Sequence, residues 1–177
     1  MIRRTIPQKT ISNEVELNGV GLHSGQKVNI KFKPAPVDTG LVFIREDLLE
    51  DNMIDANIKY ISNTDRGTNI DNGTVRIQTS EHVLAALVGL GIDNCFISLN
   101  GPEVPIMDGS SKDFIQVLET AEIKEQSILR EEFFPDSPIT FKDEESGGEI
   151  SLVPYENYSL DTTVDYGTKV LGTQKAY

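Results

Sequence analysis

SEHVLAALVGLGIDN, residues 80–94, contains a helix start, an apolar helix, a glycine stop and the beginning of a strand. Thr79 and Ser80 are both good helix caps, because a hydroxyl can accept a hydrogen bond from a free first-turn N–H. The apolar residues that follow leave almost no polar face, which predicts a helix buried on most sides. Gly91 is the expected left-handed cap of this helix, and residues 92–99 are the expected strand.

A carboxylate and an imidazole, Glu81 and His82, lie side by side in the first turn of this predicted helix. The helix dipole favours a carboxylate at that position. The imidazole of His82 could be a metal ligand, but a catalytic zinc site needs three protein ligands, and the chain has only two histidines. The alternative is a capping carboxylate beside a hydrogen-bonded histidine, and on spacing alone this structural interpretation is the favoured one.

Composition excludes several classes of protein. The formal net charge of −12 argues against nucleic-acid binding, which requires a basic surface. No apolar run reaches the length of about eighteen residues that marks a transmembrane segment. The start, MIRRTIPQKT, lacks the apolar region of a secretory signal, and the single cysteine, Cys95, fits a reducing compartment. We therefore expect a cytoplasmic protein without a transmembrane segment.

The second histidine, His23, lies in the glycine-rich stretch GVGLHSG, residues 19–25. This stretch fits a hairpin turn, and it also fits a loop that brings His23 close to a ligand. It lacks the lysine and the helix start of a nucleotide-binding loop. The strict alternation of residues 27–33 predicts a half-buried strand, and residues 41–44 are expected to pair with it as a hairpin.

The remaining patterns predict an α+β chain with an incomplete second part. Residues 71–73, Asp-Asn-Gly, indicate a hairpin turn, and residues 111–121 have the spacing of an amphipathic helix. The charged stretch 123–136 is the expected exit from a first domain. Strands are expected at 139–141, 150–153 and 158–166, with no helix after them, and a small sheet of this kind would leave one face uncovered.

Four stretches, taken together and in order, resemble the UDP-3-O-acyl-N-acetylglucosamine deacetylases, a family of zinc amidases of lipid A biosynthesis. They are GVGLHSG (Gly19–Gly25), KPAPVDTG (Lys33–Gly40), SEHVLAALVGLGIDN (Ser80–Asn94) and GPEVPIMDGSS (Gly101–Ser111). The resemblance implies two α/β domains, each a sheet packed on helices in two layers. Residues 1–126 would form the first domain and residues 127–177 the beginning of a similar, truncated second one.

The resemblance also implies roles for the residues at the helix start. His82 would be one of three zinc ligands, and Glu81 the general base acting on the zinc-bound water. The substrate would be an acylated UDP-N-acetylglucosamine, and the products acetate and the free 2-amine. His23 matches a histidine of the family's glycine-rich loop near the cleft, which implies a supporting role.

The family pattern is incomplete in this sequence. The family's other two zinc ligands, a histidine and an aspartate on a helix, belong to the second domain and would lie beyond Tyr177. We therefore expect a fragment that binds zinc poorly and is inactive alone. Some family members are fused to a 3-hydroxyacyl carrier-protein dehydratase, so such a fusion is possible here. The alternative is a non-catalytic sugar-nucleotide-binding or interaction domain of the same ancestry.

Overall fold

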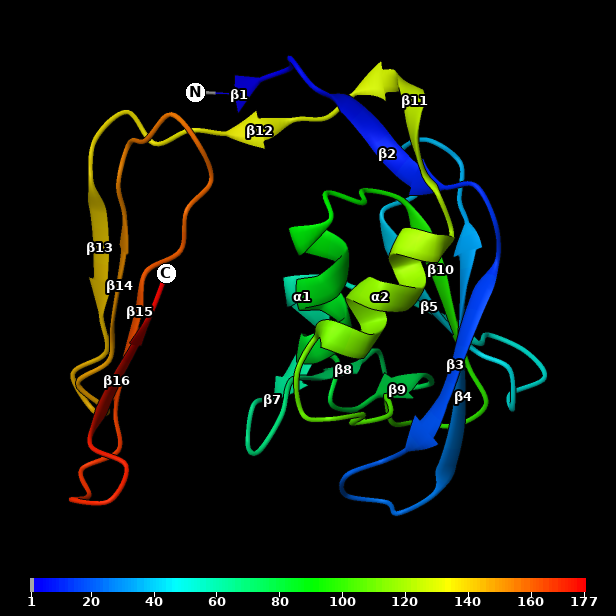
Figure 1. The fold of residues 1–177 in the computed structure, drawn as a ribbon, viewed down its shortest axis with the longest axis horizontal. Helices are drawn as coiled ribbons and strands as arrows, with labels where there is room; N and C mark the ends of the chain where they lie inside the picture. Colours follow the sequence, from blue (N-terminus) through cyan, green and yellow to red (C-terminus); the bar gives the residue numbers. More distant parts are fainter. Residues whose placement is uncertain (1) are drawn as a thin grey trace. The chain divides into compact units, whose positions relative to one another are not determined.

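The computed structural model describes residues 2–177, which divide into two compact units. The larger unit is Arg4–Arg130, and the smaller one joins residues 2–3 to Glu131–Tyr177. Among the described residues, the two α-helices lie in the larger unit, α1 at Glu81–Gly89 and α2 at Lys112–Thr120. Strands occur in both units (Figure 1). The predicted α+β class is therefore confirmed.

A five-stranded sheet of order β3-β4-β10-β5-β6 forms the base of the larger unit. Its strands are β3 (Val15–Val20), β4 (Lys27–Pro34), β5 (Leu41–Arg45), β6 (Met53–Asp55) and β10 (Cys95–Leu99). β10 runs antiparallel to β4 and parallel to β5. The predicted hairpin of β4 and β5 is therefore wrong, because the almost completely buried β10 lies between them. A turn-rich connection indicates that the chain reverses, but it does not show which strand becomes the neighbour.

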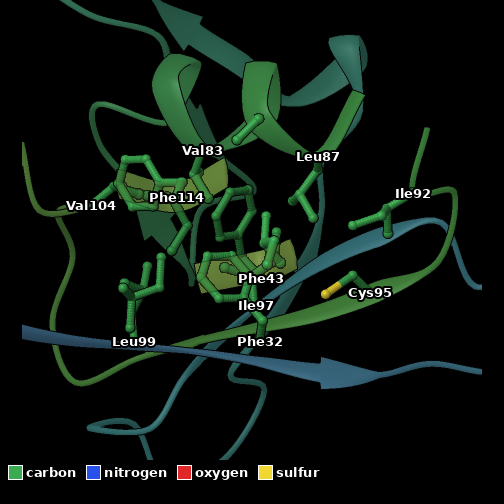
Figure 2. Packing of buried hydrophobic residues seen from close by; sticks show 14 of the residues in the cluster. Phe32, Phe43, Val83, Leu87, Ile92, Cys95, Ile97, Leu99, Val104 and Phe114 are labelled. Carbon is green, nitrogen blue, oxygen red and sulfur yellow. The ribbon is translucent and has the colours of Figure 1, made fainter. Parts of the chain in front are cut away.

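The core of the larger unit lies between this sheet and the two helices. The buried face of β4 alternates with a polar face, as residues 27–33 predict. Figure 2 shows Val83 and Leu87 of α1 directed toward Phe32, Phe43 and Ile97 of the sheet. All five side chains are fully buried. The larger unit is thus a two-layer packing of sheet against helices.

Smaller elements close the edges of this unit. β2 (Pro7–Ile11) pairs antiparallel with β11 (Ile123–Leu129). A three-stranded sheet contains β7 (Ile61–Asn63), β8 (Asn69–Asp71) and β9 (Arg76–Ile77), preceded by the 3-10 turn η1 (Ile58–Tyr60). The hairpin predicted at Asp71-Asn72-Gly73 is confirmed by the antiparallel pairing of β8 and β9.

The helix α1 ends as its glycines predict. Gly91 has a φ of +69°. Its N–H donates to Val88 O at 2.9 Å, and the N–H of Ile92 donates to Leu87 O at 2.9 Å. This pair of hydrogen bonds is the Schellman arrangement, which satisfies the last carbonyls of the helix. The strand that follows is shorter than predicted and begins at Cys95.

Replacing Gly91 with alanine is expected to lower the free energy of unfolding by about 1–2 kcal/mol, because a Cβ is strained in the left-handed region. The matched control is Gly89→Ala, two residues earlier. Gly89 is helical, and a Cβ there would meet no atom within 4 Å. That variant should be stabilised by about 0.5–1 kcal/mol. Urea unfolding of both variants measures the two effects, and equal signs would contradict the cap assignment.

The smaller unit consists of three strand pairs. They are β1 (Ile2–Arg3) with β12 (Glu132–Phe133), β13 (Ile139–Lys142) with β14 (Glu149–Leu152), and β15 (Thr162–Asp165) with β16 (Thr173–Ala176). Every residue of β13 to β16 is exposed. The strands predicted at 139–141 and 150–153 are confirmed, the one at 158–166 is shortened to β15, and β16 was not predicted.

Candidate functional site

The first turn of α1 carries Glu81 and His82 at the surface of the larger unit. Their side chains are 36% and 27% exposed, and Glu81 Oε1 lies 3.8 Å from His82 Nε2. A carboxylate oxygen and an imidazole nitrogen therefore lie close together and are partly accessible to solvent. The hydroxyl of Ser111 holds the backbone of His82, because it donates to His82 O at 2.9 Å.

Thr68 fixes the start of α1 in place of the predicted hydroxyl cap. Ser80 is the N-cap, but its side chain accepts no capping hydrogen bond. Its hydroxyl donates instead to Thr68 O at 2.9 Å. Glu81 Oε2 in turn accepts the N–H of Thr68 at 2.8 Å. Ser80 is therefore confirmed as the N-cap residue, but the expected capping hydrogen bond is absent, because Thr68 O accepts the hydroxyl. The N–H of the same Thr68 orients the Glu81 carboxylate.

His23 lies in the loop of the antiparallel β3–β4 hairpin, so the turn interpretation of its glycine-rich stretch holds. The same loop reaches toward the helix start, because His23 Nε2 lies 3.2 Å from Arg66 O. Residues 66–68 therefore contact both His23 and Glu81. We call these residues the 66–68 segment. No direct contact joins His23 to Glu81 or His82 among the hydrogen bonds and ion pairs of the described residues.

Glu103 is the member of this region that sequence reasoning missed. It lies in the loop between β10 and α2, and it is 1% exposed. Its Oε1 accepts the N–H of His23 at 2.8 Å, and its Oε2 accepts the N–H of Ser24 at 2.8 Å. The hydroxyl of Thr79 donates to Oε1 at 3.3 Å. The available signal was a glutamate between a proline and an apolar residue in a rigid loop.

The hydrogen bonds keep Glu103 ionised inside the protein. Burial by itself raises the pKa of a carboxyl group, because it disfavours the charged form. At Glu103 the hydrogen bonds from Ser24 and His23 outweigh burial, and its pKa lies below the usual range. The interior therefore holds a negative charge whose partners are loop N–H groups and a hydroxyl.

The described residues supply only part of a metal site. Within residues 2–177 there is no group of three or more His, Cys, Asp or Glu side chains arranged to hold a metal ion. His82 can offer one ring nitrogen, and Glu81 is a carboxylate beside it. Nor does any helix in this part of the chain have the length and apolar character that crossing a bilayer requires.

Comparisons with known proteins give one consistent result. The family model described as LpxC: UDP-3-O-acyl N-acetylglycosamine deacetylase matches residues 8–177. A bifunctional enzyme LpxC/FabZ of Chlorobaculum tepidum is 44% identical over 96% of this chain and 36% of its own length. A UDP-3-O-acyl-N-acetylglucosamine deacetylase of Legionella pneumophila (strain Corby) is 41% identical over 91% of this chain and 52% of its own length.

A third relative, the deacetylase of Acidithiobacillus ferrooxidans, is 40% identical over 94% of this chain and 54% of its own length. The chain therefore spans about a third of the length of the bifunctional relative and about half of the length of the others. The similarity covers the helix start with Glu81 and His82, since the family match runs from residue 8 to residue 177.

Proposed function

This chain belongs to the LpxC family of UDP-3-O-acyl N-acetylglycosamine deacetylases, and we propose that it is the amino-terminal part of such an enzyme. The reaction would hydrolyse the acetamide of a UDP-3-O-acyl-N-acetylglucosamine in lipid A biosynthesis, and release acetate and the free 2-amine. The observation that carries this proposal is the pair of Glu81 and His82, fixed by neighbouring loops and accessible to solvent at the helix start.

Glu81 is suited to the proton transfers of amide hydrolysis. Its Oε2 is engaged by the N–H of Thr68, while Oε1 faces the imidazole of His82. A positioned carboxylate can take a proton from the attacking water as the new C–O bond forms. The same proton can then pass to the nitrogen as the C–N bond breaks, so that the amine leaves neutral. One residue therefore acts first as the general base and then as the general acid.

His82 is suited to hold zinc as one ligand of several. Its ring is partly exposed, and its backbone is fixed by Ser111. When bound, zinc would lower the pKa of a water molecule and polarise the acetamide carbonyl. A catalytic zinc site needs three protein ligands. We propose that the other two belong to a part of the protein outside these 177 residues. The chain covers only 52% and 54% of the length of two relatives, which supports this proposal.

Two further features belong to the proposal. The single cysteine, Cys95, is buried and free, which fits a reducing cytoplasm. The relative from Chlorobaculum tepidum and one from Bacteroides thetaiotaomicron are both named bifunctional LpxC/FabZ enzymes. We therefore include a fused dehydratase in the proposal for the full-length protein.

The test is an acetate-release assay on the longer protein that contains this chain, with UDP-3-O-acyl-N-acetylglucosamine labelled in the acetyl group. We expect release that stops when a chelator removes zinc and returns when zinc is added. Binding of the sugar nucleotide without any acetate release would contradict the enzyme proposal. It would instead support a non-catalytic sugar-nucleotide-binding domain of the same ancestry.

A further inference from the structure

Glu103 is the acidic side chain that the larger unit buries most completely, at 1% exposure. A buried carboxylate is costly unless its oxygens are hydrogen-bonded. Each of its two oxygens accepts one backbone N–H, from His23 and from Ser24, and Oε1 also accepts the Thr79 hydroxyl. Two of these donors belong to the glycine-rich loop, and the third precedes α1. The carboxylate therefore connects two segments that are far apart in the sequence.

The backbone on both sides of Glu103 is hydrogen-bonded to Gln78, which lies between β9 and α1. Gln78 N–H donates to Pro102 O at 2.7 Å, and Val104 N–H donates to Gln78 O at 3.0 Å. The next residue, Thr79, is 2% exposed and has a φ of +57°. A β-branched residue in the left-handed region is an outlier that its surroundings must hold in place. The hydroxyl of Thr79 points to Glu103, so the carboxylate contacts this strained position directly.

The glycine-rich loop leaves room for this carboxylate at Gly21. A Cβ added there would lie 2.8 Å from Glu103 Cδ and would also collide with Glu103 Oε2 and Ser24 Oγ. The loop is closed by hydrogen bonds between Gly21 N–H and Gln26 O and between Gly25 N–H and Gly21 O, each 3.0 Å long. The absence of a side chain at Gly21 therefore allows the loop N–H groups to close on the carboxylate.

We propose that Glu103 is a positioning residue of the deacetylase. It connects the glycine-rich loop, residues 19–25, to the start of α1. In this way it holds His23 against the 66–68 segment that orients Glu81. The inference rests on the proposed function. The chain of contacts is continuous: Glu103 holds the N–H of His23, His23 Nε2 meets Arg66 O, and Thr68 N–H meets Glu81 Oε2. Glu103 itself touches neither Glu81 nor His82 among the contacts of the described residues.

A carboxylate is required at this position because both oxygens accept N–H groups. In Glu103→Gln one oxygen is replaced by an NH₂ group, which would face an N–H donor of the loop, while size and burial stay the same. The pKa of Glu103, held below its usual range by these hydrogen bonds, agrees with a permanent negative charge. Glu119→Gln on α2 makes the same change of charge at an exposed position and is the matched control.

The first experiment uses the longer protein and measures kcat and KM for acetate release. Glu103→Gln should lower kcat by about 10- to 100-fold, the range known for outer-shell partners that orient metal ligands, with KM nearly unchanged. His23→Ala should lower kcat to a similar extent, and the double variant should lose no more than the worse single variant. Gly21→Ala, which displaces the carboxylate from the loop side, should reproduce the effect of Glu103→Gln. Glu119→Gln should behave as the wild type.

Three results would overturn the proposal. Wild-type kcat in Glu103→Gln is one, and multiplication of the two single losses in the double variant is another. The third is a loss of kcat in Glu103→Gln that matches the fraction of unfolded protein at the assay temperature. That result would show that Glu103 only stabilises the fold. Melting curves of Glu103→Gln and Gly21→Ala, recorded in parallel, separate this case.

A second experiment keeps the inference testable if the longer protein releases no acetate. His23 and His82 are the only imidazoles of the 177-residue chain, so their ring signals can be assigned by nuclear magnetic resonance with His82→Gln. Glu103→Gln should shift the His23 ring signals and speed hydrogen exchange at the amides of His23 and Ser24. Unchanged His23 ring signals and unchanged amide exchange would contradict the proposed positioning role of Glu103, whether or not the protein is a deacetylase.

Discussion

Glu81→Gln in the longer protein is expected to lower kcat for acetamide hydrolysis by about 10²- to 10⁴-fold, which is the contribution of a general acid–base group. The substitution keeps a side-chain oxygen that can accept the N–H of Thr68, so the fold of the helix start should be preserved. It removes the ability to take and return a proton. Steady-state acetate release measures the effect, and the melting temperature confirms that the variant is folded.

The control for this experiment is Glu119→Gln, which should leave kcat unchanged because Glu119 is exposed near the end of α2. Zinc content should stay near the wild-type value in Glu81→Gln, since His82 is retained. A Glu81→Gln variant that keeps more than about a tenth of the wild-type kcat would lie outside the range for a general base. Glu81 would then be a structural carboxylate, as its spacing alone allows.

The 177-residue chain alone is expected to show no zinc-dependent deacetylation and to bind zinc weakly. His82 offers one ring nitrogen, no group of three metal-binding side chains exists within residues 2–177, and a catalytic site needs three protein ligands. Equilibrium dialysis with zinc and an acetate-release assay on the purified chain measure both properties.

His82→Ala provides the matched control for the isolated chain. Any zinc that binds equally well to the wild-type chain and to His82→Ala is bound elsewhere and does not bear on the site. Acetate release that requires zinc and disappears in His82→Ala would refute the expectation that the chain is inactive. It would also show that the remaining ligands are not needed, or that a second copy of the chain supplies them.

The local parts of the fold could be predicted from the sequence because their causes are local. The apolar run before Gly91 indicated α1 and its left-handed end, and Asp71-Asn72-Gly73 indicated the β8–β9 hairpin. The alternation of residues 27–33 indicated β4. Each of these depends on residues within a few positions of one another.

The errors in the fold arise where distant segments compete for the same partner. β10 lies between β4 and β5, although β4 and β5 are neighbours in sequence. Val88 was predicted to be on a largely buried helix, yet its side chain is 57% exposed. Such outcomes depend on which strands and helices meet in space, and the periodicity of a single segment does not contain that information.

The site was predictable in its residues but not in its connections. Glu81 and His82 were recognisable as an adjacent carboxylate and imidazole, whereas the use of the Ser80 hydroxyl by Thr68 O was not. Glu103 was missed because its partners are backbone N–H groups, which carry no sequence signature. The roles of Glu81, His82 and His23 stay predictions until the variants above are measured.

The smaller unit gives a physical reason to expect further packing. Phe141 and Ile150 are each 68% exposed on the β13–β14 pair. Apolar side chains clustered on strands are normally covered by another layer, because a sheet alone leaves its apolar face in water. A further layer packed on this strand pair is therefore expected.

The most direct test of the central claim, that His82 is one of three ligands of a catalytic zinc site with Glu81 as the general base beside it, is the DNA sequence after the Tyr177 codon. We expect an open reading frame that encodes a helix with a histidine and an aspartate one turn apart, which would supply the two missing ligands. A stop codon directly after Tyr177, or a frame without such a helix, would contradict the claim. The binding-domain function would then be the better explanation of this chain.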